Sequence, residues 1–403
     1  MERLGRRAAL ALTGAGVFGA GLVGRFGAAR AETGTLPFGN GERPVVQYPG
    51  KRKLLRLTTR PPQLETPFAV FNEALITPND AFFVRYHLAD IPLEIDPVTF
   101  RLAVKGAVDR PLSLSLEDLK QLGTTEIVAV NQCSGNSRGF FEPRVAGGQA
   151  GNGLMGNARW TGVPLKTVLD RAGVTPGAVQ VRFDGMDGPV SDATPDFVKA
   201  LPIDQARDGE VMVAWAMNGE NLPFLNGYPL RLIVPGHYGT YWMKHLNEVT
   251  VVDQPVKTFW MDTAYRIPDN DCNCVEPGTA PSQTKPIGRF KVRSFITSVA
   301  SGAQIPAARP VVLKGIAFDG GSGIKQVEFS ADGGKTWQGA TLGEDLGRYS
   351  FRDWQAAVTL PAGEHALQAR ATSNAGETQP VTQPWNPSGY LRNLIETTTV
   401  RAA

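Results

Sequence analysis

The stretch NQCSGNSRG, residues 131–139, ends a hydrophobic run and begins a loop of small, turn-forming residues. Because Ile127–Val130 predicts a strand, we expect Cys133 at the C-terminal end of that strand, with its sulfur accessible. Arg138, five residues further on, can lower the pKa of a neighbouring thiol and favour the thiolate. A thiolate there is suited to a soft metal centre, whereas the commonest role of a lone cysteine is that of a buried structural residue.

Around this loop, short strand-like runs alternate with brief helical ones from residue 66 to 267, which predicts a mixed α+β domain. Ser115–Leu122 begins with a capping serine and has acidic residues in its first turn, so it predicts a short helix. Val163–Gly173 predicts a second helix that ends at its glycine. The runs that predict strands are Glu126–Val130, Val179–Phe183, Val211–Ala216 and Leu230–Val234.

The residues on either side of this domain have a different composition. Residues 32–65 show no sustained period and are expected to form an extended arm over the body, and the polar, Pro-rich residues 268–286 are expected to be a linker. Regularly spaced strands separated by turns follow in residues 287–403, which indicates an immunoglobulin-like β-sandwich without the Cys…Trp…Cys pattern of antibody domains. The runs that predict its strands are Val292–Val299, Pro310–Asp319, Gly323–Ser330, Ser350–Val358 and Glu364–Thr372.

The N-terminus has the pattern of an export signal. Arg6 and Arg7 precede the apolar run Ala8–Val23, and Ala29–Ala31 offers a cleavage site. The paired arginines indicate the twin-arginine route, so residues 1–31 are expected to be removed and the protein to be periplasmic. The alternative is a retained anchor, but the run is shorter than the ~20 residues that span a bilayer.

The charge and the cysteines exclude several classes of protein. The net charge of +3 includes five Arg and one Glu in residues 1–31, so the rest has +3 − 4 = −1, which gives no reason to expect nucleic acid or an anionic membrane as partner. Three cysteines are too few for a zinc site or a disulfide framework. No C-x-x-C-H sequence is present, so no covalent haem is expected, and no cytochrome b5-like domain is recognisable, so no haem of any kind is expected in this chain. Cys272 and Cys274 could be bridged in an oxidising compartment.

Further motifs contain residues that suit anion binding. In FFVRYH (82–87), a spacing of two places Arg85 and His87 on one face of an extended segment. The stretch NGYPLRLIVPGHYGTYWMKHL (226–246), the triplet Gly185–Asp187 and Tyr265 in DTAYRIP follow. Each has an ordinary structural alternative, namely a solvated arginine, a packed histidine, a turn aspartate or a buried tyrosine.

Taken together, these motifs identify a resemblance. NQCSGNSRG and the following FFEPRVAGGQAGNGLMGNARWTGVPL (140–165) resemble the sulfite oxidase family, and most of all its bacterial sulfite dehydrogenases, over essentially the whole chain after residue 31. The resemblance implies an α+β molybdopterin-binding domain followed by an immunoglobulin-like dimerisation domain. WNPSGYLRN (385–393) is similar to part of that second domain.

The resemblance also implies roles for individual residues. Cys133 would bind molybdenum, and the catalytic residues would be Arg85, His87, Arg138 and Tyr265. The remaining contacts to the molybdenum–molybdopterin cofactor would come from Phe83, Tyr86, His87, Asp187, Asn226, Arg231, His237, Trp242, Met243 and Lys244. The sequence departs from the family at two positions, since Asn226 stands where the family often has His and Tyr241 where it often has Arg.

The implied activity is the oxidation of sulfite to sulfate, with electrons passed singly to an external c-type cytochrome by a homodimer that has no membrane span after processing. Other enzymes remain as alternatives, namely a sulfane dehydrogenase, which usually lacks the G-N-S-R found at Gly135–Arg138, and a sulfoxide reductase, which usually lacks the C-terminal domain. A metal-free binding module with the same fold is the alternative from another class.

Overall fold

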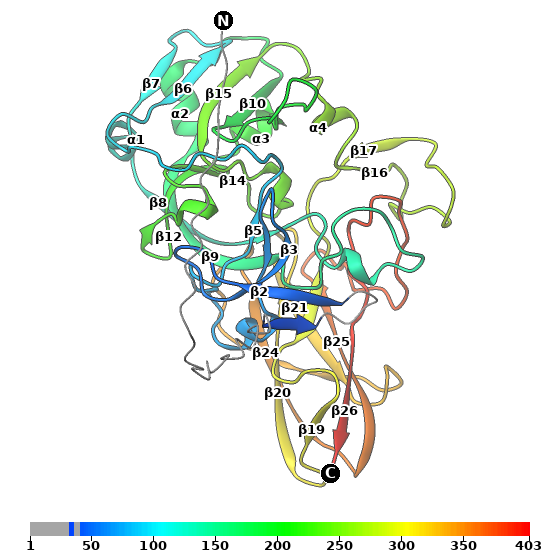
Figure 1. Cartoon of the computed structure of the whole chain (residues 1–403). Coiled ribbons are helices and arrows are strands. Elements are labelled where there is room, and N and C mark those ends of the chain that lie inside the picture. Colours follow the sequence, from blue (N-terminus) through cyan, green and yellow to red (C-terminus); the bar gives the residue numbers. More distant parts are fainter. Residues whose placement is uncertain (1–31, 36–40) are drawn as a thin grey trace, which may run out of the picture. The chain divides into compact units, whose positions relative to one another are not determined.

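The structure is a computed structural model that describes residues 32–35 and 41–403 (Figure 1). The predicted signal peptide, residues 1–31, lies outside the described residues. In the part of the chain that the structure describes, no helix is long and apolar enough to cross a membrane.

Residues 32–65 were expected as an extended arm, but their described part instead forms most of an antiparallel sheet. Its strands, in both chain and spatial order, are β1 (Thr33–Thr35), β2 (Glu42–Val46), β3 (Leu54–Thr58), β4 (Gln63–Glu65) and β5 (Val84–Arg85). Strands of two to five residues are too short for a visible alternation, which is why the sequence did not indicate them. Leu54, Leu64, Val84 and Tyr86 form a small apolar core on this sheet, and the sheet fixes the position of Arg85.

Two further sheets form the predicted α+β domain. One has the order β11 (Lys199–Pro202), β10 (Gln180–Gly185), β15 (Leu246–Val252), β6 (Leu102–Gly106), β7 (Leu112–Leu114). Within it only β15 and β6 pair in parallel. The other has the order β13 (Glu220–Asn221), β12 (Met212–Met217), β9 (Met155–Pro164), β8 (Thr125–Gln132), and β14 (Arg231–Ile233) also pairs with β12. The strands predicted in this domain are therefore confirmed to within a few residues.

Both predicted helices are confirmed. In α1 (Leu116–Gln121), the Ser115 side chain accepts a hydrogen bond from the Asp118 backbone N–H, and the Asp118 carboxylate accepts one from the Ser115 backbone N–H. Helix α2 (Leu165–Ala172) ends at Gly173, whose φ of 75° is left-handed. The remaining helices are single turns: α3 (Ile203–Ala206), α4 (Phe259–Asp262), and the 3₁₀ helices η1 (Phe68–Asn72), η2 (Arg138–Phe140), η3 (Phe224–Asn226) and η4 (Gly239–Tyr241).

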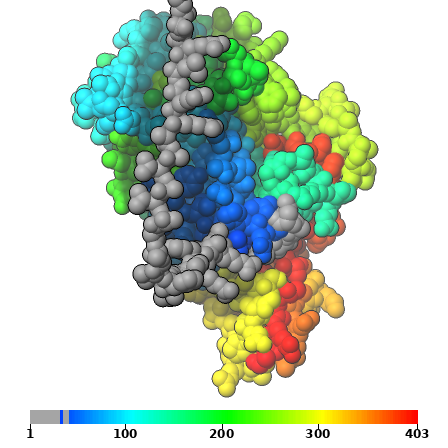
Figure 2. Space-filling model, viewed as in Figure 1, coloured from blue at the N-terminus to red at the C-terminus, as the bar shows by residue number. Residues whose placement is uncertain are grey.

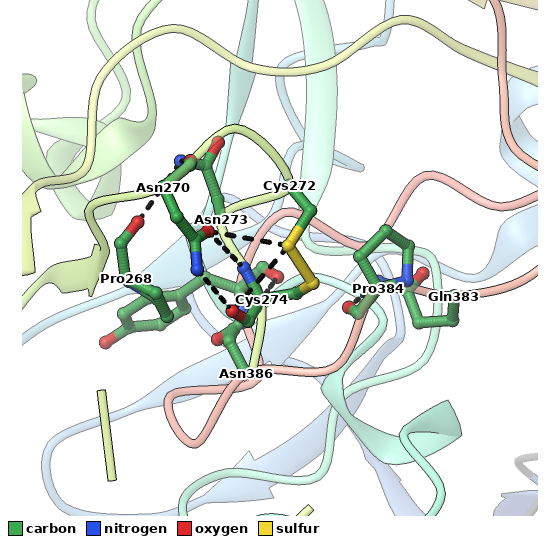
Figure 3. The surroundings of a disulfide bond; sticks show 9 residues. Pro268, Asn270, Cys272, Asn273, Cys274, Gln383, Pro384 and Asn386 are labelled. Atoms are coloured by element: carbon green, nitrogen blue, oxygen red, sulfur yellow. Dashed lines mark hydrogen bonds between the residues drawn. A yellow bond between two sulfur atoms is a disulfide. The ribbon is translucent and has the colours of Figure 1, made fainter. Parts of the chain in front are cut away.

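The predicted linker is partly ordered by hydrogen bonds. Strand β16 (Arg266–Pro268) pairs with β17 (Thr284–Pro286), and Cys272 and Cys274 between them form a disulfide (Figure 3). Asn270 and Asn273 bind backbone carbonyls of the same loop, Asn270 that of Cys274 and Asn273 that of Pro268. The bond that the sequence left open is thus present, and it lies beside Pro384 and Asn386 of the C-terminal segment.

The C-terminal residues form the predicted β-sandwich. One sheet has the order β18 (Arg293–Ile296), β20 (Pro310–Phe318), β24 (Arg352–Thr359), β23 (Thr341–Leu342). The other has the order β19 (Ala303–Ile305), β26 (Thr397–Ala402), β25 (Gly363–Ser373), β21 (Ile324–Ser330), β22 (Gln338–Gly339). Strands β19, β22, β23 and β26 were not predicted, because three of them are very short and β26 is mostly polar. Leu313, Phe329, Trp354, Leu367 and Val400 are at the centre of the sandwich core.

The main core of the α+β domain continues into the sandwich. Phe295, Phe318 and Phe351 of the C-terminal residues belong to the same buried cluster as Val130 and Trp160. The backbone N–H of Val130 also donates to the Tyr349 carbonyl at 2.9 Å. The strand that leads to Cys133 is therefore packed against the sandwich.

Candidate active site

Cys133 lies directly after β8, as predicted, at the beginning of a tight turn. Its backbone N–H donates to Leu154 O at 2.9 Å and its carbonyl accepts from Asn136 at 3.0 Å. Ser137 then takes a left-handed φ of 68° and starts the single turn η2. The residue is half-buried and its thiol is free, so it can reach a ligand while its backbone is held by Leu154, directly before β9.

A cavity lies beside this thiol. Nine residues predicted from the sequence contribute to its wall: Phe83, Arg85, His87, Cys133, Asn226, Arg231, Trp242, Lys244 and Tyr265. Residues from four separated motifs therefore meet at one place. The other lining residues are Asn131, Ser134, Phe197, Leu225, Gly239 and Thr240, none of which was predicted.

Arg85 and His87 share the cavity, as their spacing predicted. Burial opposes the charge of Arg85, but the neighbouring Tyr265 and Cys133 more than compensate and raise the pKa of Arg85. His87 is stacked on Phe197, with 3.4 Å between ring centroids, and its Nε2 is 2.5 Å from the Tyr265 hydroxyl. Burial, together with the charge of Arg85, places the pKa of His87 well below its usual value. The imidazole is therefore neutral at neutral pH, and its Nε2 can either donate a hydrogen bond to the Tyr265 hydroxyl or accept one from it.

Two more cations come from the stretch 226–246. Arg231, on β14, donates from Nη1 to Asn226 O at 2.8 Å, and Lys244 donates from Nζ to Arg85 O at 2.7 Å. Burial, reinforced by Arg231 and opposed by Asp187, lowers the pKa of Lys244 to about 7. An anion bound in the cavity would restore the charge of this lysine, because opposite charges favour ionisation.

Arg138 does not line the cavity but lies close to it. Its Nε donates to Ser388 O at 3.2 Å, and its guanidinium carbon is 5.0 Å from the centroid of the Tyr390 ring. Its charge also acts to lower the pKa of Tyr265. The side chain is half-buried.

The structure places four other predicted contacts outside the cavity. The Tyr86 hydroxyl is buried against His245 Nε2 at 2.7 Å, and Met243 is buried in the core. His237 is hydrogen-bonded to Gln205 at 3.1 Å, and burial lowers its pKa to about 4. Tyr86, Met243 and His237 therefore make their contacts away from the cavity in this structure. Asp187 is buried behind the wall and interacts electrostatically with Lys244.

Comparisons with known proteins give the family. Residues 88–260 match the oxidoreductase molybdopterin binding domain, and residues 284–401 match the Mo-co oxidoreductase dimerisation domain. The chain is 34% identical to mitochondrial sulfite oxidase of Mus musculus over 92% of its length and 69% of that protein. The chain belongs to the sulfite oxidase family.

Two further matches carry different names, sulfite oxidase and sulfane dehydrogenase. This sulfite oxidase family member is 29% identical to sulfite oxidase of Arabidopsis thaliana, over 88% of the chain and 96% of that protein. The crystal structure of the sulfane dehydrogenase SoxCD from Paracoccus pantotrophus matches 95% of the chain and 93% of its own, with a TM-score of 0.73 and 25% identity. The predicted fold class is thereby confirmed.

The cavity contains unpaired polar atoms that could bind a molybdenum–molybdopterin cofactor. Among the described residues, His87 Nδ1, both amide atoms of Asn131, Ser134 Oγ, Arg231 Nε and Thr240 Oγ1 are buried without a partner, and all six side-chain atoms belong to cavity-lining residues. A buried unpaired polar group costs about 1–3 kcal/mol, so together they indicate a polar ligand. The arginines and Lys244 fit its anionic groups, and the Cys133 thiolate would be the soft ligand of its metal.

Asn226, which stands where the family often has His, has a hydrogen-bond partner that the sequence did not indicate. Lys51, on the segment before β3, is buried and donates from Nζ to Asn226 Oδ1 at 2.5 Å and to Phe82 O at 3.0 Å. Asn226 Nδ2 in turn donates to Phe83 O at 2.9 Å. The polar atoms of the Asn226 side chain are thus already hydrogen-bonded within the protein. The hydroxyl groups of Thr240 and Ser134 are the ones without a partner among the described residues, so they are free to bind a ligand in the cavity.

Three further residues near the site were missed. Phe197 supports His87, and Lys199 lies with its Nζ 5.3 Å from the centroid of the Tyr265 ring. Tyr390 stacks on Tyr265, with 5.8 Å between centroids and 6° between ring planes. Only Tyr390 lay in a quoted motif, WNPSGYLRN, which had been interpreted as a feature of the C-terminal domain alone.

Proposed function

We propose that this protein oxidises sulfite to sulfate and passes the electrons one at a time to an external c-type cytochrome. The observation that supports this most is the free Cys133 thiol at a cavity lined by Arg85, Arg231 and Lys244. A molybdenum–molybdopterin group bound there would supply oxygen-atom transfer and accept the two electrons. Similarity to sulfite oxidases over most of the chain supports sulfite as the substrate.

The chain's own residues would bind and orient the substrate. Sulfite is a small dianion, and guanidinium groups offer fixed forks of donors that suit oxyanions at any working pH. Arg85 is within reach of the Cys133 sulfur, and its elevated pKa keeps it charged. The neutral His87 and the Tyr265 hydroxyl form a hydrogen-bonded pair at the same wall, which can hold or move a proton as the charge of the site changes.

The location and the assembly belong to the same proposal. The twin-arginine pattern at Arg6–Arg7 supports export to the periplasm, and that route carries folded proteins, which suits a cofactor inserted in the cytoplasm. The match of residues 284–401 to a dimerisation domain supports a homodimer, the commonest soluble oligomer. The cytochrome would dock near the cavity in a weak, transient complex, and this chain would have no haem and, after processing, no membrane span.

A sulfane dehydrogenase is the second candidate, favoured by the similarity to SoxCD over 95% of the chain. Purified holoenzyme tests both. We expect about one molybdenum per chain by mass spectrometry, a pentavalent molybdenum EPR signal on anaerobic addition of sulfite, and sulfite-dependent reduction of cytochrome c. Turnover of thiosulfate without turnover of sulfite would favour the sulfane dehydrogenase. Turnover of methionine sulfoxide would favour a reductase, and folded protein without molybdenum would favour a binding module.

A further inference from the structure

The loop that carries Arg138 is held from the C-terminal domain. Arg293 on β18 donates from Nη1 to Ser137 Oγ at 3.0 Å, and Trp385 donates from Nε1 to Pro143 O at 2.8 Å. Figure 2 shows the teal surface of residues near 145 against the red surface of the last part of the chain. The segment before β26 is therefore part of the wall around Arg138, not only of a separate sandwich.

Arg138 itself lies in a slot with glycine on three sides. A Cβ on Gly147 would come within 2.7 Å of its Nη1, and one on Gly389 within 2.9 Å of its Cγ. A Cβ on Gly135 would come within 2.9 Å of Nη1. The backbone at these glycines therefore lies close to the Arg138 side chain. The slot leaves the face of the guanidinium against the Tyr390 ring, at 5.0 Å.

Tyr390 connects this slot to the cavity. Its ring is stacked on Tyr265, which contacts His87 and lines the cavity. Burial raises the pKa of Tyr390, with Arg138 and Arg85 opposing and Cys133 reinforcing that effect. The phenol therefore stays neutral, so its ring keeps the electron-rich face that attracts a cation.

We propose that Tyr390 is a positioning residue for oxyanion recognition: its ring holds the Arg138 guanidinium beside the Cys133 cavity, so that the C-terminal domain sets the affinity for the anionic substrate. The proposal rests on the proposed function in naming sulfite as that substrate. A guanidinium over an aromatic face at this distance is within the ~6 Å range of a cation–π interaction, and Arg138 has no acidic partner among the ion pairs of the described residues.

The test compares Tyr390→Phe, which keeps the ring, with Tyr390→Leu, which removes it. We expect Tyr390→Leu to raise the KM for sulfite about threefold to tenfold with kcat changed less than twofold, and Tyr390→Phe to stay within about twofold in both. The dissociation constant of sodium sulfate, measured by calorimetry on the oxidised holoenzyme, should rise by the same factor in Tyr390→Leu. Molybdenum content and melting temperature establish that each variant is loaded and folded.

Trp337→Leu is the matched control. In the same domain, the guanidinium carbon of Arg370 lies 4.2 Å from the centroid of the Trp337 ring, so Trp337→Leu removes an aromatic–arginine contact that is not at the site, and Arg370 keeps its ion pair with Glu328. It should leave both constants unchanged. An unchanged sulfate affinity in folded, loaded Tyr390→Leu would overturn the proposal, as would equal losses in Tyr390→Phe and Tyr390→Leu.

The two proposals fail in different ways. If the parent protein binds sulfate but does not oxidise sulfite, the proposed function is wrong, and the sulfate constants still decide the role of Tyr390. If the parent oxidises sulfite and Tyr390→Leu does so with an unchanged KM and sulfate affinity, only the inference about Tyr390 is wrong.

Discussion

The two cores of this chain are built on opposite principles. The sandwich core around Trp354 and Phe329 is apolar, and along β24 buried and exposed residues alternate with the pleat. The core around Cys133 encloses Arg231 and Lys244, and it leaves polar atoms of Asn131 and Thr240 without partners among the described residues. The first core consists of apolar side chains, whereas the second contains polar atoms that a ligand could satisfy.

This difference separates residues that stabilise the fold from residues that bind. Burying an unpaired polar group is unfavourable, so a fold retains such groups where a ligand satisfies them. Substitutions in the sandwich core should therefore change stability more than chemistry. Substitutions at the cavity should do the reverse, and the following experiments test that contrast from the largest expected effect to the smallest.

Removing the sulfur should have the largest effect. Cys133→Ser takes away the soft ligand and keeps the shape of the side chain, so we expect molybdenum content to fall at least tenfold and sulfite oxidation by more than about a hundredfold. Mass spectrometry of the metal and steady-state assays measure both. The double variant Cys272→Ser/Cys274→Ser, which changes the other two sulfur positions, should keep its molybdenum. Normal metal content in Cys133→Ser would mean that the sulfur is not needed to bind the metal, and it would contradict the contrast between a core that stabilises and a core that binds.

The sandwich core should respond in stability. Trp354 is 1% exposed and its Nε1 donates to Ser294 Oγ at 3.0 Å, so Trp354→Ala should cost about 3–5 kcal/mol. Denaturant unfolding measures the loss, and Trp337→Ala, at a half-buried position of the same domain, is the smaller-cost control. At a temperature where the variant is folded, its KM for sulfite should equal that of the parent. A stable variant with altered KM would contradict this separation.

Arg138 should respond in catalysis. Replacing Arg138 by Gln removes roughly 1.5–3 kcal/mol of charge-assisted bonding per contact, a loss of about tenfold to over a hundredfold in kcat/KM for sulfite. Stopped-flow or steady-state assays measure it. Arg101→Gln, an exposed arginine whose Nη1 binds the Val98 and Phe100 carbonyls, is the control with the same change of charge. Parental rates in Arg138→Gln would mean that Arg138 supports the fold alone.

Measured over one pH unit, the buried Lys199 should give the smallest effect, a dependence of stability on pH. Burial, aided by Arg266 and opposed by Asp262, lowers the pKa of Lys199 from 10.5 to about 7. Between these values the unfolded chain binds the extra proton, so stability rises with pH through this window, by at most about 1.4 kcal/mol per pH unit. Below pH 7 the lysine is charged in both the folded and the unfolded chain, so the full cost of burying its charge lowers the stability of the fold. Melting temperatures from pH 7 to 9 should rise less steeply in Lys199→Met than in the parent, and equal slopes would contradict the assignment.

The sequence predicted those parts of the site that lie within single short motifs. Arg85 and His87 both line the cavity, as their spacing of two predicted, and Cys133 follows a strand that its own hydrophobic run indicates. The resemblance to the family added Arg231, Lys244 and Tyr265, which all line the cavity. Residues within the same motifs that point elsewhere, such as Tyr86 and Met243, could not be distinguished, because a motif does not give the orientation of each side chain.

What the sequence could not give depends on contacts between distant residues. Lys51 and Asn226 are 175 residues apart, and Arg138 and Ser388 are 250 residues apart. No periodicity records such pairs, so Lys51 and Tyr390 were missed. The sheet β1–β5 was missed for the opposite reason: its strands are so short that only pairing with neighbours defines them.

The hydrogen bond between Arg138 and the backbone of Ser388 also sets the stage of synthesis at which the site can be fully formed. The arginine leaves the ribosome 250 residues before its partner, so during all of that synthesis one side of the slot is absent. The recess beside Cys133 therefore acquires its final form only late in translation. A chaperone or insertion factor that loads the cofactor would meet a finished recess only after the C-terminal residues have folded, and a chain truncated before residue 385 should be inactive even with every cavity-lining side chain in place.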